Sequence, residues 1–262
     1  MVGIPILSCS GRTLAETWEN SLKLVMIDGI DINNQYEATP SRDCSMLMTV
    51  HDPLAEPMIT RCLPGGLEDL WKYYCEVCLG TRDHEIRNPA DPEDERWLYT
   101  YHDRLTNYRA INQIEAIIDG LYVSPFTRRV QAITWKPEVD LATHDPPCLQ
   151  SIWCRLSPNF DGYFLNMNTR WRSRDAYRAA FMNMFVMVEF MKHIASELTT
   201  RLGVPVYLGR YVDFSDSYHI YGSMVDDVTK RALPLLTTRS ESERTYTYSE
   251  YIQDLSIVEG TP

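Results

Sequence analysis

The longest run of hydrophobic positions lies between residues 171 and 203. Its opening, 171–175, is charged, and the chain is then apolar on almost every face through 179–188, with Asn183 as an amide in the middle. A helix that is apolar all round belongs in the centre of a large domain. Charges return from Glu189 onward, too soon for a membrane span of about 18 apolar residues. We therefore expect a buried central helix over residues 171–203. An unpaired amide inside it would cost about 1–3 kcal/mol, so Asn183 needs a backbone or ligand partner.

Shorter periodic patterns surround this stretch. Apolar residues at helical spacing predict amphipathic helices over 13–29 (capped by Thr13), 68–79 and 111–121. Apolar runs bounded by Pro, Gly and Asp predict strands over 46–50, 130–135, 149–156, 163–167 and 204–208. Helices and strands are mixed without regular alternation, which indicates an α+β fold with a mixed or antiparallel sheet.

The bulk composition narrows the class of protein. The length suits one domain over residues 1–262, with a loosely packed C-terminal tail over 237–262. A net charge of −11 argues against nucleic acid as a partner. We expect no membrane span, no secretory signal and no metal site. The odd count of seven cysteines then predicts free thiols in a cytoplasmic setting. Cys75 and Cys78 form a lone CxxC, which is more typical of a helix beside a core than of a zinc or redox site.

Cys148 is the candidate nucleophile. Two prolines precede it and restrict the direction of its thiol. Neighbouring arginines would favour the reactive thiolate, although a single free cysteine is more often an inert core residue. Arginines that suit bidentate phosphate binding stand where loops meet predicted elements, at Arg42, Arg128, Arg129 and Arg172, the last followed by Ser173. Each alone is typical of a surface charge, but together they could form one dianion pocket.

The order and spacing of these residues resemble the thymidylate synthase family. The frames from Arg172 to Asn183 and from 111–114 to Arg129 match that family without a gap. The resemblance spans most of the chain, from Arg42 to Tyr221. The family includes thymidylate synthase and the hydroxymethylases of deoxycytidylate and related nucleotides.

The resemblance implies a fold, a reaction and a set of roles. The sheet would form the interface of a homodimer with shared active sites, with 5,10-methylenetetrahydrofolate as cofactor and a pyrimidine nucleoside monophosphate as substrate. Cys148 would add to C6 of the base, and Tyr101 would be the active-site tyrosine. The remaining roles would be phosphate binding by Arg42, Arg172, Ser173 and the partner's Arg128 and Arg129; base and sugar binding by Asn183, His219 and Tyr221; and folate binding by Asp175 and Trp97.

Several residues have a plainer alternative. His219 could be a core histidine, Tyr221 a packing residue, Asp175 a helix N-terminal acid and Asn183 a structural amide. Glu68 fits the family's catalytic glutamate by its neighbours, but the spacing to Gly80 is too long, so Glu76 is a rival.

Two departures from the family bear on the product. The shielding tryptophan is not placed securely, with Trp97 the nearest candidate, and the C-terminus lacks the usual apolar closing tail. Both favour water, and so hydroxymethylation of a cytidine nucleotide (CMP or dCMP), over reductive methylation of dUMP by a thymidylate synthase. Asn183 instead favours uracil as the base, although its side-chain amide in the flipped orientation also matches the hydrogen-bonding edge of cytosine. A third hypothesis is a family member that binds nucleotides without catalysis.

Overall fold

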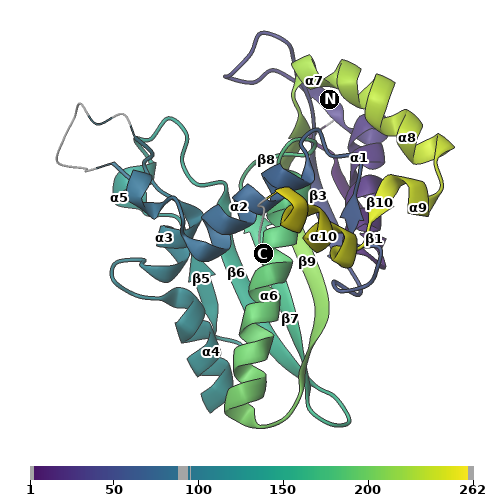
Figure 1. Ribbon diagram of the computed structural model, residues 1–262. Helices are drawn as coiled ribbons and strands as arrows, with labels where there is room; N and C mark the ends of the chain where they lie inside the picture. Colours follow the sequence, from purple (N-terminus) through teal and green to yellow (C-terminus); the bar gives the residue numbers. More distant parts are fainter. Residues whose placement is uncertain (1–2, 88–93, 95, 259–262) are drawn as a thin grey trace. The chain divides into compact units, whose positions relative to one another are not determined.

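A computed structural model describes residues 3–87, 94 and 96–258 (Figure 1). The chain divides into two compact units. The first comprises Met1–Leu70, Arg170–Phe185 and Gly209–Pro262, and the second comprises Trp71–Thr169 and Val186–Leu208. Four elements contribute residues to both units: α2 (Leu67–Leu79), β7 (Tyr163–Trp171), α6 (Ala180–Leu202) and β9 (Val206–Ile220).

The first unit contains strands that run in both directions. Strand β3 (Ser41–Val50) pairs in parallel with β1 (Ile6–Gly11) and antiparallel with β9. The short β2 (Ile30–Ile32) is antiparallel to β3, and β8 (Arg174–Asp175) is parallel to β9. The predicted α+β fold with a mixed sheet is therefore confirmed.

Helix α1 (Leu14–Asp28) packs on β1 and β3, as the periodicity of residues 13–29 predicts. The Thr13 hydroxyl accepts a hydrogen bond from the backbone N–H of Glu16, which satisfies one of the free donors at the helix start. Its predicted inward residues, which include Trp18 and Leu22, are fully buried.

The C-terminal part of the first unit forms short elements up to residue 258. They include part of the segment 237–262 that was expected to be a loose tail, of which 259–262 lie outside the described residues. The elements of this C-terminal part are α7 (Gly222–Asp227), the π-helix η2 (Val228–Ala232), α8 (Leu233–Thr238), α9 (Glu241–Arg244), β10 (Thr245–Tyr246) and α10 (Tyr248–Val258). Strand β10 pairs with β4 (Ile59–Thr60), and α10 buries Tyr251 and Leu255. These few apolar anchors among polar residues hold the segment, which is why composition alone did not indicate its packing.

The second unit carries helices beside a run of antiparallel pairing. Strands β7, β6 (Leu149–Pro158) and β5 (Gln131–Ile133) are neighbours in that order. The helices are the 3₁₀ turn η1 (Asp83–Glu85), α3 (Tyr101–Thr106), α4 (Gln113–Val123) and α5 (Pro137–Asp140). Helix α4 turns Ile114, Ile117 and Ile118 inward as predicted and contacts β5 and β6.

Helix α6 is the buried helix that the hydrophobic run predicts, but it begins at Ala180 rather than at Trp171. Residues Arg174 and Asp175 pair as a strand with Tyr218 and His219 of β9, so the charged opening is extended. Pairing with a distant strand overrides the local pattern here. At its other end α6 stops at Gly203, whose φ of 70° is the left-handed conformation that glycine tolerates.

Two strands are longer than their apolar runs. Strand β3 starts at Ser41 instead of residue 46, and β9 continues to Ile220 instead of ending at 208. Both extensions carry polar side chains. These can lie within strands because the groups that they contact are polar too. Asp213, for example, is fully buried and forms an ion pair with Arg174. A buried charge with a bidentate partner can occupy a strand position that a hydropathy pattern assigns to a loop.

The CxxC pair lies on α2 as two helical residues. The Cys78 thiol donates to the backbone oxygen of Val186, and burial raises its pKa, so it is a poor thiolate. All seven cysteines are free thiols. In the described part of the chain, no helix is long and apolar enough to cross a membrane.

Candidate active site

Cys148 stands immediately before β6 and is partly buried. The phenol oxygen of Tyr101 accepts the backbone N–H of Cys148 at 3.0 Å and that of Leu149 at 3.2 Å. Tyr101 is the first residue of α3, whose start is capped by Thr100. The structure thus brings together the predicted nucleophile and the predicted active-site tyrosine, although the two are far apart in sequence.

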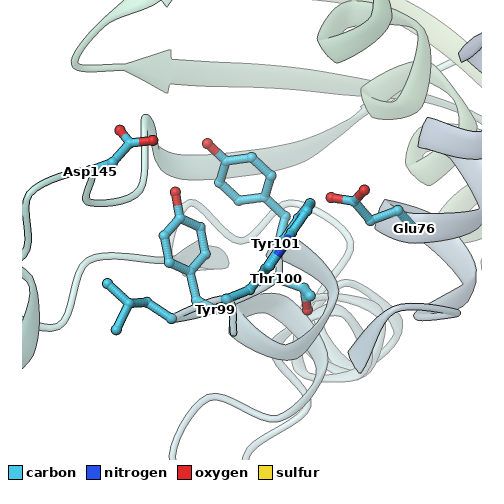
Figure 2. A pocket seen from close by; sticks show the side chains of 7 residues that line it. Glu76, Tyr99, Thr100, Tyr101 and Asp145 are labelled. Carbon is cyan, nitrogen blue, oxygen red and sulfur yellow. The ribbon is translucent and has the colours of Figure 1, made fainter. Parts of the chain in front are cut away.

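A cavity of about 330 Å³ lies beside this pair in the second unit. Its walls include Glu76, Trp97, Tyr99, Tyr101 and Asp145. Figure 2 shows the carboxylates of Glu76 and Asp145 on opposite sides of the two tyrosines. Its volume is at the lower end of the range for ligand pockets, and its aromatic walls suit a flat ring.

The two rival glutamates are in different surroundings. Glu68 is exposed in the first turn of α2. Glu76, two turns later on the same helix, lines the cavity, and burial raises the pKa of its carboxyl against the opposing effect of the Arg82 guanidinium. A carboxyl with a raised pKa in a cavity is typical of a general acid or base. The geometry favours Glu76 over Glu68.

Trp97 also lines the cavity, as the family resemblance leads us to expect of the shield residue. The guanidinium of Arg82 lies 4.2 Å from the centroid of its ring, so one face of the indole is covered by a cation. The same arginine forms ion pairs with Glu85 and Glu76. The part of the cavity lined by Trp97 therefore lies next to charged side chains and is not a purely apolar surface.

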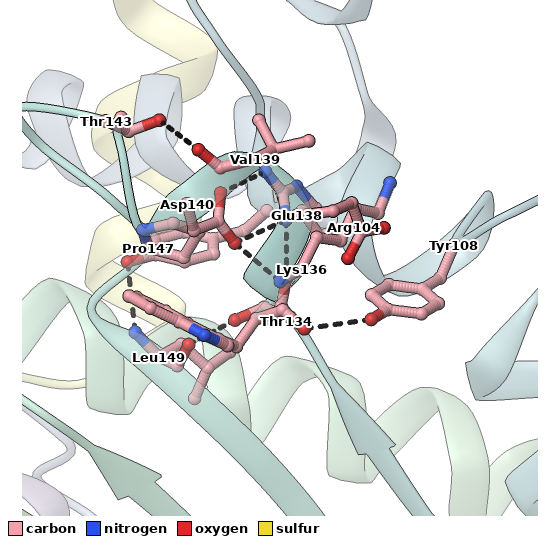
Figure 3. Close-up of polar contacts among 12 residues, drawn as sticks. Arg104, Tyr108, Thr134, Lys136, Glu138, Val139, Asp140, Thr143, Pro147 and Leu149 are labelled. Carbon is pink, nitrogen blue, oxygen red and sulfur yellow. Dashed lines mark hydrogen bonds and ion pairs between the residues drawn. The ribbon is translucent and has the colours of Figure 1, made fainter.

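A buried ion pair that the sequence did not reveal supports the segment before Cys148 (Figure 3). Arg104 of α3 binds both carboxylate oxygens of Asp140, at 2.7 and 2.9 Å, and donates to the backbone oxygen of Thr134 at 2.7 Å. The Thr134 hydroxyl in turn donates to the backbone oxygen of Leu149. This network fixes the start of β6 and with it the cysteine. The positions of Arg104 and Asp140 in the sequence follow no recognisable motif, so only their contacts in the structure identify them as an ion pair.

Replacing Tyr101 by phenylalanine should reduce the free energy of unfolding by about 1–3 kcal/mol, because the buried N–H groups of Cys148 and Leu149 would both lose their acceptor. Urea unfolding measures this change. Tyr122→Phe, on the exposed face of α4, is the matched control and should be neutral. Equal stability of the two variants would show that the phenol oxygen does not hold the cysteine backbone.

In the first unit, a small hollow of about 120 Å³ collects four more of the predicted residues. Arg172, Ser173, His219 and Tyr221 all line it, together with the polar segment 32–36. The rings of His219 and Tyr221 pack edge to face with centroids 4.8 Å apart. A guanidinium, two hydroxyls and an imidazole around one hollow are suited to a phosphorylated sugar.

Arg42 is not among the residues that line this hollow. Its guanidinium donates to the backbone oxygens of Met26 and Ile27 at the end of α1 and pairs with Asp31. Alternation along β3 directs it to the face opposite Ser41 and Asp43, which do line the hollow. The structure thus gives Arg42 contacts at the end of α1, and its predicted phosphate contact stays a prediction.

Asp175 lies on β8, before α6 begins, and Asn183 lies within α6. The Asp175 carboxylate accepts the backbone N–H groups of Tyr177 and Arg178 and the Arg178 guanidinium, so it stabilises the turn that leads into the helix. This differs from the plainer alternative of a helix N-terminal acid, because the first turn of α6 carries no acidic residue. Asn183 is buried on the second turn of the helix.

Arg128 and Arg129 follow α4 on an exposed segment before β5. Within the described residues, neither guanidinium lies within ion-pair distance of a carboxylate. The backbone oxygen of Arg128 accepts the indole N–H of Trp153, which fixes the segment while the two cations point outward. Both remain available to an anionic ligand.

Comparison with known proteins identifies the family. Residues 77–257 match the family model described as thymidylate synthase. A protein of Methanopyrus kandleri is 33% identical over 189 residues, which cover 71% of this chain and 81% of the relative. A protein of Methanocaldococcus jannaschii is 31% identical over 231 residues, covering 85% and 94%. The chain belongs to the thymidylate synthase family, whose members transfer a one-carbon unit to C5 of a pyrimidine nucleoside monophosphate with 5,10-methylenetetrahydrofolate as donor.

A solved structure supports the fold. The thermostable thymidylate synthase A from Bacillus subtilis superposes with a TM-score of 0.59 over 83% of each chain, at 17% identity. At this identity the similarity concerns the fold alone.

Proposed function

We propose that the protein catalyses hydroxymethylation at C5 of a cytidine 5′-monophosphate or its deoxy form, through a covalent adduct with Cys148. The observation that carries the choice of product is the cavity beside Cys148. Its walls are polar at Glu76 and Asp145, and a cation covers one face of Trp97. Carboxyl groups at these two points of a mainly aromatic wall hold water, and water at the reacting carbon gives a hydroxymethyl group where a hydride would give a methyl group.

The cavity also fits the cofactor's flat ring system through Trp97 and the two tyrosines. When bound, 5,10-methylenetetrahydrofolate supplies a one-carbon unit at the oxidation level of formaldehyde. The protein's part begins when the Cys148 thiolate adds to C6 of the base, which opens the C5–C6 double bond and makes C5 a nucleophile. After C5 has taken the one-carbon unit, loss of the C5 proton to a base would accompany cleavage of the bond between that carbon and the cofactor nitrogen, with tetrahydrofolate as the leaving group. Addition of water to the resulting exocyclic methylene expels the thiolate and restores the ring.

Glu76 is the group we place at the proton transfers. Its carboxyl lines the same cavity as Tyr101, which holds the backbone of the nucleophile. Burial raises the pKa of Glu76, which favours its protonated form and suits a group that gives and takes protons.

The remaining roles concern substrate binding. Arg172 and Ser173 would bind the phosphate, and His219 and Tyr221 the sugar, because all four line one hollow. Asn183 would contact the base edge, and Asp175 would contact the folate ring. Arg128 and Arg129 would reach the phosphate held by a second copy, so the enzyme would be a homodimer with shared sites. We place it in the cytoplasm.

Reductive methylation of dUMP is the second candidate. The similar archaeal proteins carry the name "Putative thymidylate synthase", which favours this reaction.

Release of tritium from 5-³H-labelled CMP, dCMP, UMP and dUMP with methylenetetrahydrofolate tests the proposal. We expect release from a cytidine nucleotide without the absorbance increase of dihydrofolate. Release from dUMP with that increase would establish the synthase reaction instead. No release from any substrate, with nucleotide binding retained, would show a family member that only binds.

Arg128→Ala should lower activity by about 10-fold or more, because a desolvated charge-assisted contact with phosphate is lost. If the contact is made across the dimer, mixing this variant with Cys148→Ala should restore activity, since each mixed dimer contains one intact site. Activity of the reassembled mixture, measured against each variant alone, tests this. A mixture no more active than its components would contradict the shared site. Arg155→Ala, an exposed arginine on β6, is the control.

A further inference from the structure

The hollow of the first unit has a wall made by three side chains that the β3–β9 ladder brings together. Asp43 stands directly opposite His219 in the antiparallel register, so their side chains emerge on the same face. Ser217 precedes His219 by two residues, beside a register shift opposite Cys44 and Met46. Such irregularities redirect side chains next to functional sites. All three residues line the hollow.

Hydrogen bonds connect the three in a chain. The Ser217 hydroxyl donates to Oδ2 of Asp43 at 2.8 Å and lies 3.2 Å from Nδ1 of His219. A hydroxyl has one proton, and a carboxylate can only accept. When Asp43 is ionised, the proton of Ser217 goes to its carboxylate, and the imidazole is then the donor in the second contact. Nδ1 of His219 then carries the hydrogen, and Nε2 carries the lone pair.

The surroundings keep this imidazole neutral and fixed in orientation. His219 is buried, its backbone oxygen accepts the N–H of Ala176, and its ring packs against Tyr221. Burial is the largest influence on its pKa and lowers it, Arg178 acts in the same direction, and Asp175 and Asp43 oppose them. The lone pair on Nε2 is thus available above the lowered pKa.

We propose that Asp43 and Ser217 are positioning residues that hold His219 as its Nδ1–H tautomer, so that Nε2 accepts a hydrogen bond from a sugar hydroxyl of the ligand. The identity of the ligand rests on the proposed function, in which this hollow holds the sugar of a nucleotide. The tautomer itself does not. A neutral histidine with the opposite tautomer would present a donor to the hollow and would favour an acceptor on the ligand.

Nitrogen-15 NMR of histidine-labelled protein tests the tautomer directly, without substrate. The signal of His219 is identified by its absence from His219→Gln. We expect the Nδ1–H pattern in the unsubstituted protein and in Ser217→Thr, which keeps the hydroxyl. Ser217→Ala removes the hydroxyl acceptor and should lower the share of the Nδ1–H form. Asp43→Ala leaves the hydroxyl free to donate to Nδ1, so it should convert His219 to the Nε2–H form. Ser45→Ala, whose hydroxyl binds the Asp216 backbone oxygen, is the matched control and should retain the Nδ1–H pattern.

Binding of nucleotides supplies the second measurement. Ser217→Ala should weaken binding of CMP or dUMP about 10-fold and leave binding of the 3′-deoxy analogue unchanged. An Nε2–H pattern in the unsubstituted protein, or no change in Ser217→Ala, would overturn the positioning role even if nucleotides bind. A tautomer that responds as expected, in a protein that binds no nucleotide, would support the positioning role and refute the proposed function.

Discussion

Cys148→Ala should lower tritium release by at least about 10³-fold, because in the proposed mechanism its thiolate forms the bond to C6 that makes C5 reactive. Nucleotide affinity should stay within a few-fold, since phosphate and sugar contacts are made by other residues. The backbone N–H of Cys148 donates to Tyr101 whatever the side chain, so the fold at the start of β6 should be retained. Release rates and equilibrium dialysis with the same nucleotide measure the two effects.

Cys9→Ala is the control for this change. Cys9 lies on β1, is partly buried and has a pKa raised to about 12 by burial, so it is not expected to react at neutral pH. Its substitution should leave release within about twofold. Substantial turnover in Cys148→Ala would remove the thiol from the mechanism, and loss of nucleotide binding would show that the change had disrupted the site as a whole.

Glu76→Gln should lower activity by about 10²–10⁴-fold, the usual contribution of a positioned general acid or base. The amide keeps the size of the side chain but cannot exchange a proton. Glu68→Gln on the same helix is the direct comparison, and we expect it to stay within about twofold because that side chain is exposed. The reverse ranking would identify Glu68 as the catalytic carboxyl.

The stability of Glu76→Gln relative to the parent protein should also depend on pH. Burial raises the folded-state pKa of Glu76 above its ordinary value of about 4.3, so the folded chain binds the proton more tightly than the unfolded chain does. Ionisation of Glu76 therefore destabilises the fold as pH rises from about 4 through the raised pKa. Glu76→Gln should gain stability relative to the parent across that window. A gap in unfolding free energy that does not widen toward neutral pH would contradict the raised pKa.

Hydrophobic periodicity predicted much of the fold. The elements whose bounds it predicted wrongly share one cause. Helices α1 and α4 bury the faces that their spacing predicts, because each needs only one apolar stripe against a sheet. The start of α6 and the length of β9 were missed because their conformation depends on each other: Arg174 and Asp175 are extended where they pair with Tyr218 and His219. Such pairing leaves no local hydropathy signal.

The candidate site shows the same division. The order of residues that the family shares predicts site roles for Tyr101, Cys148, His219 and Tyr221. The sequence could not show the contacts of Arg42 with the end of α1, because they depend on which face of β3 the side chain occupies.

By itself, the sequence determined the family and the α+β class, and it predicted Cys148 as the nucleophile, because these depend on residue types at fixed spacing. Only the tertiary structure decided that Glu76 rather than Glu68 lines the cavity and that Asp43 and Ser217 support His219. The physical reason is that a pKa shift or a tautomer depends on which groups lie within a few ångströms. That proximity comes from strand register and helix packing between residues distant in the chain.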